Sequence, residues 1–416
     1  MLRAGAESLN VSGCGPWADG SRVFVGCVEE PGFGDGNLIK GPRDRLPAGR
    51  RERSMAWVGF AVGLCLFALT WSSVVKTLLV PGNTRSLIAR VAARGVLTGF
   101  RLGASRIAGV ERRERVLAAG PPVFLVGLLG CWIACLYLAY ALILLPFADS
   151  PGTALRMSGS SLFTLGFATP DGAVPYGIVF VAAISGIAVI ALMIGYMPTL
   201  YAAYNRRETL VIMLAALSGM PPWGPELLAR QQLIGNAAYL ARVYERWAEW
   251  AADISESHTT YRTLIYFRSR NPRQAWPLAL LAVLDAAALH LALCPDSAPA
   301  EARPLLRIGF TAMRAVARTL GVRVNDDPHP GDPLALTRED FDAAVRHLAE
   351  AGWTFEREPD EAWPHFRGWR VNYETAACNI AAHLDLPPAV WSGYRARLGA
   401  VAAMPQRPVN RAPGSS

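Results

Sequence analysis

Lysine is nearly absent from this chain, since only Lys40 and Lys76 are lysine among its 41 basic residues. The seven cysteines form no CxxC pair, so the sequence indicates neither a zinc site nor a disulfide framework. The patterns GxGxxG and GxxxxGKS/T are missing as well. The sequence therefore indicates no nucleotide-binding domain of these types, and no cofactor is expected.

Apolar residues are abundant and make up 52% of the 416 positions. The formal net charge is +8, and a basic balance is typical of proteins that bind nucleic acid or an anionic membrane face. Here the arginines cluster beside long apolar stretches. We therefore expect membrane lipids as partners and no nucleic acid.

Three stretches are apolar over the roughly 20 residues that a helix needs to cross a bilayer. They run over residues 56–80, 122–147 and 176–201. The segment 81–121 between the first two contains eight arginines against two glutamates, so the positive-inside rule places it in the cytoplasm. It is either an amphipathic helix on the inner leaflet or a charge block that only sets the topology.

Alternation of the spans then places residues 148–175 outside and the C-terminus in the cytoplasm. One basic stretch does not fit, because residues 43–53 contain five arginines directly before the first span. We expect residues 1–55 to be disordered and the native start to be Met55. The proline-rich residues 397–416 are expected to form a disordered tail.

The external stretch carries signals for a short helix followed by non-helical backbone. Asp149 or Ser150 is suited to cap the helix and Pro151 to its first position, and the pattern continues for about two or three turns before Thr164. Non-helical backbone at membrane depth is tolerated where it is buried in protein or lines a water-filled cavity. A pore is the simplest such place. The alternative is a polar external loop between two ordinary spans.

The residues that follow the short helix read Thr164-Leu165-Gly166-Phe167-Ala168. Aligned on the filter signature TVGYG, residues 122–201 resemble the pore module of the potassium channel superfamily, with pore helix and filter over 150–170. The resemblance implies that the backbone carbonyls of Thr164, Leu165, Gly166 and Phe167 bind potassium and that four chains form one pore. The whole chain is similar to a bacterial single-pore potassium channel family with an extra leading span and a helical tail.

Ala168 departs from the signature, which has glycine there. Carbonyls that all face a pore require positive φ at alternate residues, and alanine resists this by about 1–2 kcal/mol. Thr169 also replaces the usual aspartate. These departures predict a weaker preference for potassium over sodium.

Gly186, Gly195 and Pro198 interrupt the third span, whose pore module we extend to residue 204. They are candidates for a hinge or gate in an inner helix. The alternative for Gly186 is that glycine simply lets a neighbouring element approach closely.

Residues 205–396 are predicted to form an α-helical cytoplasmic domain. The pattern after Thr337 has the three- and four-residue apolar spacing of a capped helix. Residues 275–293 are apolar enough to span a membrane, but Asp285 and His290 and the charged flanks favour a buried helix of a soluble domain.

The cytoplasmic half offers one candidate ligand site, in which His365, Arg367 and Arg370 hold an anion. The alternative is a packed aromatic cluster of Trp363, Phe366 and Trp369 around His365. The spacings of His258, Asp285, His365 and Glu374 match no metal or nucleophile pattern, so we expect no enzyme.

The sequence thus predicts an all-α membrane protein with three transmembrane helices, one re-entrant pore helix and filter, and an α-helical cytoplasmic domain. The expected function is passive conduction of a monovalent cation, with potassium as the expected ion, by a homotetramer in a bacterial cytoplasmic membrane. The first span lacks the arginines of a voltage sensor. The alternative function is a non-conducting, membrane-anchored sensor or scaffold that uses the pore module to oligomerise.

Overall fold

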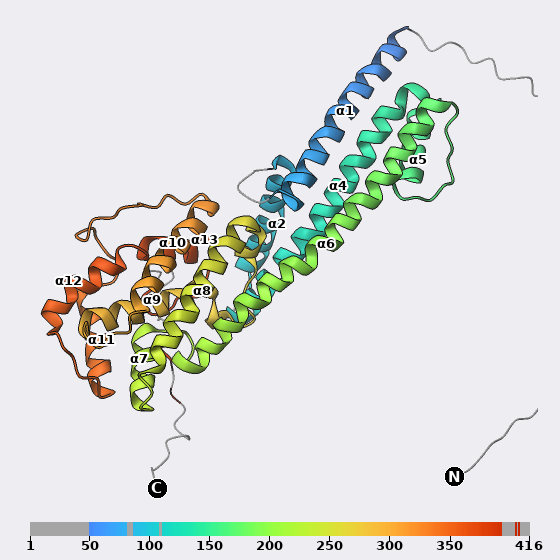
Figure 1. Ribbon diagram of the computed structural model, residues 1–416. Coiled ribbons are helices and arrows are strands. Elements are labelled where there is room, and N and C mark those ends of the chain that lie inside the picture. Colours follow the sequence, from blue (N-terminus) through green and yellow to red (C-terminus); the bar gives the residue numbers. More distant parts are fainter. Residues whose placement is uncertain (1–49, 81–85, 108–109, 393–403, 406, 408–416) are drawn as a thin grey trace, which may run out of the picture. The chain divides into compact units, whose positions relative to one another are not determined.

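The computed structural model describes residues 50–80, 86–107, 110–392, 404–405 and 407, and within these the chain is helical without a strand (Figure 1). The first half contains α1 (Arg50–Leu78), α2 (Leu87–Ser105), α3 (Val110–Ala118), α4 (Gly120–Leu144), η1 (Leu145–Phe147), α5 (Pro151–Leu162) and α6 (Ala173–Ser218). The second half contains α7 (Gly224–Leu233), α8 (Tyr239–Thr260), η2 (Arg262–Tyr266), η3 (Pro272–Gln274), α9 (Trp276–Leu293), α10 (Ala302–Leu320), α11 (Arg338–Glu350), α12 (Pro359–Arg370) and α13 (Glu374–His383).

Two predictions concern the ends of the chain, which lie largely outside the described residues. The segment 1–55 lies outside the described residues except for its last part, where α1 already begins at Arg50. The tail 397–416 lies outside them except for residues 404–405 and 407.

Within the part of the chain that the structure describes, four helices are long and apolar enough to cross a membrane, which indicates a multi-pass membrane protein. They lie in the ranges Arg53–Leu78, Arg112–Phe147, Ala173–Ser218 and Trp276–Leu293. The last one, α9, differs from the others because its whole apolar window is buried inside the chain, against 22%, 44% and 28% for the other three. It packs against α7, α8, α10, α12 and α13. α9 is therefore the centre of a helical core.

Helices α1 and α4 pack closely and antiparallel. A Cβ atom at Gly63 would lie 2.8 Å from the carbonyl oxygen of Ala139, so only glycine permits this approach. At the other end of α1, Ser73 Oγ accepts a 2.9 Å hydrogen bond from Trp132 Nε1 of α4. It also lies 2.5 Å from the Oγ of Ser86, the N-cap of α2. α2 therefore starts from a fixed point on α1 and α4.

Helix α3 is fastened to the C-terminal helices by two ion pairs. Glu114 pairs with Arg268, and Arg113 pairs with Asp385 just after α13. If the apolar helices cross a membrane, the basic α2–α3 segment and the C-terminal helices must consequently share one side of it.

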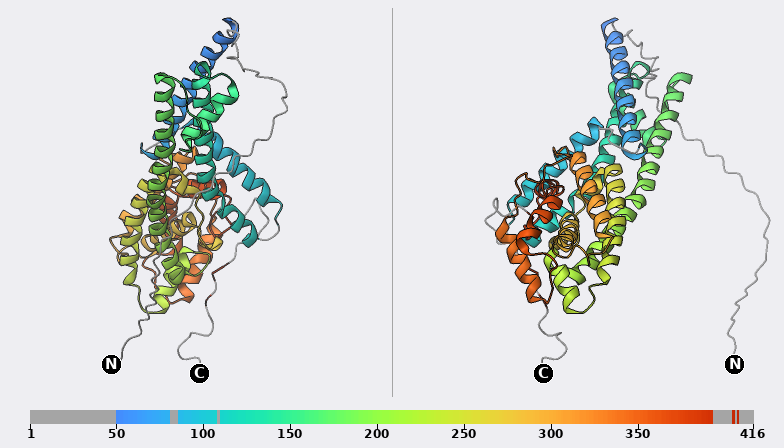
Figure 2. Two further views of the ribbon diagram at one scale, coloured as in Figure 1. Left: turned by 90° about the vertical axis from the view of Figure 1, so that its right-hand side faces the viewer. Right: turned by 60° about the vertical axis from the view of Figure 1, so that its left-hand side comes forward.

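Helix α6 is much longer than the predicted span 176–201. Its 46 residues correspond to about 70 Å at 1.5 Å per residue, more than twice the ~30 Å of a hydrocarbon core. It lies beside α4 and continues among the C-terminal helices α7, α8 and α9 (Figures 1 and 2). The helix does not stop at Arg206 and Arg207, because Arg207 is buried against the C-terminal part of the chain.

Candidate functional site

The short helix α5 begins as the sequence predicts. Ser150 is its N-cap, with the Oγ accepting a 3.2 Å hydrogen bond from the Thr153 amide, and Pro151 occupies the first turn. Twelve residues later α5 ends at Leu162.

Three contacts fix α5 between α4 and α6. Ser158 Oγ donates a 2.7 Å hydrogen bond to the Tyr137 carbonyl of α4. A Cβ at Gly159 would lie 3.2 Å from the Tyr137 ring. On the other side, a Cβ at Gly186 of α6 would lie only 2.1 Å from the Leu162 carbonyl oxygen. The end of α5 thus lies beside Gly186 of α6. At 1.5 Å per residue, Gly186 is roughly 20 Å along α6 from the first residue of α6.

The 163–168 loop, which follows α5, is held to the helix by its backbone N–H groups. The amides of Leu165 and Gly166 donate to the Ser160 carbonyl at 2.7 and 3.3 Å. The amide of Ala168 donates to Ser160 Oγ at 3.0 Å. One residue, Ser160, therefore positions the loop at three points.

These bonds set the direction of the loop's carbonyl groups. In a trans peptide the N–H and the preceding C=O point in opposite directions. Because the N–H groups of Leu165, Gly166 and Ala168 face α5, the carbonyls of Thr164, Leu165 and Phe167 point away from it. Three of the four predicted cation-binding carbonyls consequently face away from α5.

The backbone dihedrals alternate, but only in part. Thr164 has φ 55° and Gly166 has φ 72°, both in the left-handed region. Ala168, the next alternate residue, is not among the described residues with positive φ. The alternation stops at the position where alanine replaces glycine.

The apolar side chains of this loop are uncovered in the single chain. Leu165 is 64% exposed and Phe167 is 59% exposed. One surface of α6 is also apolar and open, with Phe180, Ile184 and Ile187 exposed. Such a surface requires lipid or another protein chain to cover it.

The three candidate hinge or gate residues lie in one continuous helix. Gly186 sits at the tight contact with α5, whereas a Cβ at Gly195 would meet nothing within 4 Å. Pro198 lies inside α6 without ending it. The geometry at Gly186 favours close approach, the alternative that the sequence left open. A hinge at Gly195 or Pro198 stays a prediction.

His365, Arg367 and Arg370 do not converge on a common point. His365 is exposed, while Arg367 donates to the Gly331 and Asp332 carbonyls at 2.6 and 2.9 Å. Arg370 is fully buried and pairs with two carboxylates, those of Asp285 and of Glu374, the latter at 2.8 Å. Its charge is already compensated inside the core, so the three residues form no anion site in this arrangement. The aromatic alternative fits better, because Trp363 and Phe366 both pack against Phe341.

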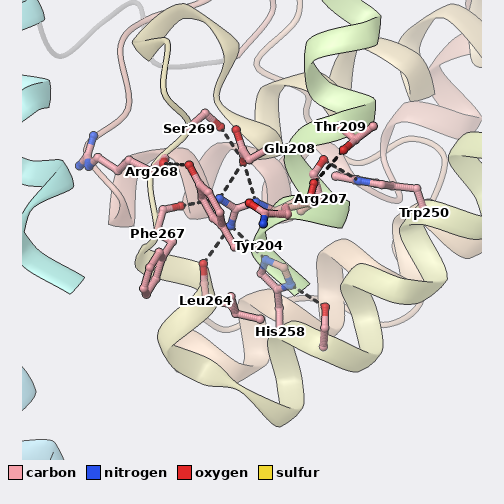
Figure 3. A network of polar contacts seen from close by, with 12 residues as sticks. Tyr204, Arg207, Glu208, Thr209, Trp250, His258, Leu264, Phe267, Arg268 and Ser269 are labelled. Atoms are coloured by element: carbon pink, nitrogen blue, oxygen red, sulfur yellow. Dashed lines mark hydrogen bonds and ion pairs between the residues drawn. The ribbon is translucent and has the colours of Figure 1, made fainter. Parts of the chain in front are cut away.

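Sequence reasoning missed the role of Arg207 in the fold. Its guanidinium donates to the carbonyls of Leu264 and Phe267 at 2.9 and 2.8 Å and to Glu208 at 2.9 Å (Figure 3). All these partners except Glu208 lie more than fifty positions away in the chain. The long α6 is thereby fastened to η2 and the residue after it.

His258 completes this network as a neutral acceptor. Burial, together with the nearby Arg207 guanidinium, lowers the pKa of His258 well below its usual value. The neutral ring lies 3.2 Å from Arg207 Nη1 through Nε2 and 3.0 Å from Ser257 Oγ through Nδ1. This assigns the proton to Nδ1, because Nε2 must accept from the guanidinium.

Among the residues that the structure describes, no group of three or more His, Cys, Asp or Glu side chains is arranged to hold a metal ion. Comparison with protein-family models, with curated proteins and with solved structures finds no match for this chain.

Proposed function

We propose that this chain is one subunit of a cation channel, with potassium as the expected ion, in which α1, α4 and α6 cross the membrane and α5 re-enters it. The observation that carries the proposal is the 163–168 loop, whose N–H groups face α5 and whose carbonyls face away. A row of carbonyls directed to one side is what replaces the hydration shell of a cation. Conduction is not a reaction, so no residue is assigned a catalytic role.

The depth of the loop supports a pore. The end of α5 lies beside Gly186, well inside the apolar part of α6. Lipid-exposed, non-helical backbone does not occur at such depth, because its polar groups would have no partner. The loop must therefore be covered by protein or face water.

Covering the loop requires further chains, because Leu165 and Phe167 are open in the single chain. Each chain supplies one row of carbonyls, and a closed ring around a cation needs several. A homotetramer, the arrangement of the potassium channel superfamily that residues 122–201 resemble, meets both needs.

The basic segment sets the orientation of the proposed channel. Its arginines favour the cytoplasm by the positive-inside rule. The ion pairs Glu114–Arg268 and Arg113–Asp385 support the same side for the C-terminal helices. In this proposal the channel lies in a bacterial cytoplasmic membrane. Helices α7–α13 form its cytoplasmic domain, which Arg207 fastens to α6.

Substitution at Gly166 tests the proposal. Gly166→Asp places a side chain on a residue with φ 72° in the row of carbonyls. We expect it to abolish cation flux into liposomes while the tetramer still assembles. Ala168→Gly is the complementary variant and should raise the potassium-over-sodium permeability ratio. Full flux in Gly166→Asp would reject the role of the loop.

The second candidate function is a non-conducting membrane-anchored scaffold. The dihedrals at Ala168 favour it, because the left-handed alternation stops there. In that case the tetramer would assemble and carry no current, and Ala168→Gly would leave it silent.

A further inference from the structure

A cavity of about 440 Å³ lies where the basic helix α2 meets the inner ends of the apolar helices and the C-terminal helices. Small-molecule sites typically enclose ~300–1,000 Å³. Its walls come from α1, α2, α4 and α6 on one side and from α8, η2 and the ends of α10 and α13 on the other. Of the contacts described above, only the one between Ser73 and Ser86 touches its wall, through Ser86.

The charge of the cavity wall is of one sign. Lys76, Arg90, Arg94 and Arg262 line it together with His383, and none of the described lining residues is acidic. Four fixed cations around one space create a positive potential that favours an anion.

The hydroxyl groups of the wall suit a multiply accepting anion. Thr98, Thr260 and Thr263 line the cavity beside the cations. Arg90 and Arg94 are one helical turn apart and so lie on the same face of α2. Arginine forks and hydroxyl donors together match the oxygens of a phosphate group.

One part of the wall is apolar and adjoins the membrane-crossing helices. Phe124 belongs to the first turns of α4, and Tyr196 belongs to the apolar part of α6. Ala89 and Ala93 of α2 also line it with small side chains. The cavity therefore has cations on both walls, Lys76, Arg90 and Arg94 from α1 and α2 and Arg262 from η2, and an apolar half where the apolar helices end.

We propose that this cavity binds the phosphate group of an anionic phospholipid from the adjacent leaflet. The cations hold the phosphate, and the apolar half receives the start of the acyl chains. A soluble phosphate ester carries the same head chemistry, but it would leave the apolar half unfilled. The proposal depends on the membrane placement of α1, α4 and α6 and not on conduction.

The test measures lipid binding by native mass spectrometry of the full chain in detergent, titrated with phosphatidylglycerol or with phosphatidylcholine. We expect phosphatidylglycerol to bind more tightly. Arg90→Gln with Arg94→Gln should weaken its binding about tenfold or more, because charge-assisted hydrogen bonds are lost. The matched control is Arg106→Gln with Arg112→Gln, which removes the same charge from exposed residues of the same basic segment outside the cavity.

A second variant covers the case in which the double substitution fails to fold. Ala93→Trp keeps every charge and puts a large ring into the cavity that Ala93 lines, so it should also abolish tight binding. Glycerol phosphate added in excess separates the two sources of phosphate. No displacement supports the lipid headgroup, whereas full displacement supports a phosphate site with a soluble ligand. Equal binding of both lipids, or equal losses in both arginine pairs, would overturn the proposal.

Discussion

The α-carbon of Gly186 in α6 lies so close to the carbonyl oxygen of Leu162 that a Cβ atom there would come within 2.1 Å of it. This contact joins the long helix that reaches the C-terminal domain to the end of the short helix that positions the 163–168 loop. Any side chain at residue 186 must push α5 away.

Gly186→Ala should therefore lower the free energy of unfolding by about 1–3 kcal/mol, as overpacking does, and reduce flux. Gly195→Ala is the matched control, since it meets nothing within 4 Å and should be neutral or stabilising by up to about 1 kcal/mol. Thermal unfolding in detergent measures both. If the two variants were equally stable and both altered gating, Gly186 would act as a hinge instead.

Ser160 should matter more than its neighbour Ser161. Ser160→Ala removes the hydroxyl that accepts from the Ala168 amide and leaves that N–H without its partner in the chain. A lost hydrogen bond of this kind costs about 0.5–1.5 kcal/mol, so we expect a looser loop and a lower permeability ratio of potassium to sodium. Ser161→Ala, which touches no hydroxyl bond of the loop, should leave the ratio unchanged. Identical ratios in both variants would argue against the hydroxyl's role.

Arg207 is expected to hold α6 to the C-terminal helices. Arg207→Met removes the donor to the carbonyls of Leu264 and Phe267 and leaves Glu208 with only Ser269 as a donor, and breaking a buried pair costs about 3–5 kcal/mol. The adjacent Arg206 forms an exposed pair with Asp253 at 3.1 Å, and such pairs contribute about 0–1 kcal/mol. Arg206→Met is therefore the control in a denaturation experiment. Similar losses in both variants would contradict the role of the buried network.

The sequence predicted the local features of this molecule well and the distant ones poorly. Caps depend on a few adjacent residues, and both Ser150 and Thr337 form them, the latter in a capping box with Asp340. The extension of α6 to Ser218 was missed because Arg207 is buried by partners at 264 and 267, which no local pattern reveals.

The same limit explains the candidate sites. Arg370 was taken as a ligand contact because it sits near other basic and aromatic residues in sequence, yet it pairs in the core with Asp285, far away in the chain. The alternating residues Thr164 and Gly166 could be predicted from the filter signature, whereas the hydroxyl of Ser160 that holds Ala168 could not. The basic cavity draws its wall from residues between 76 and 383, so only the folded chain brings it together.

Glu226 of α7 should hold Arg407, near the C-terminus, by a contact that is lost at low pH. Burial alone would raise the pKa of this carboxyl, but hydrogen bonds from His347, Arg407 and Arg230 more than offset burial and lower the pKa to about 2. The unfolded value is about 4.3, so the stabilisation is complete above that pH and is lost as the pH falls towards the folded pKa.

Thermal unfolding between pH 7 and pH 3 measures this contact. As the pH is lowered past about 4, the melting temperature of the native chain should decrease. In Glu226→Gln this decrease should be smaller. Parallel curves for the two proteins would show that the carboxyl does not contribute. The control is Asp360→Asn, which removes an exposed carboxyl paired with Arg338.

The most direct test of cation conduction is the reversal potential of the full chain in planar bilayers, with potassium on one side and sodium on the other. We predict a reversal potential that is shifted from zero towards the potassium equilibrium potential. In Ala168→Gly this shift should be larger. Absence of current from protein shown to be tetrameric would contradict the channel proposal. The non-conducting scaffold would then be the remaining candidate function.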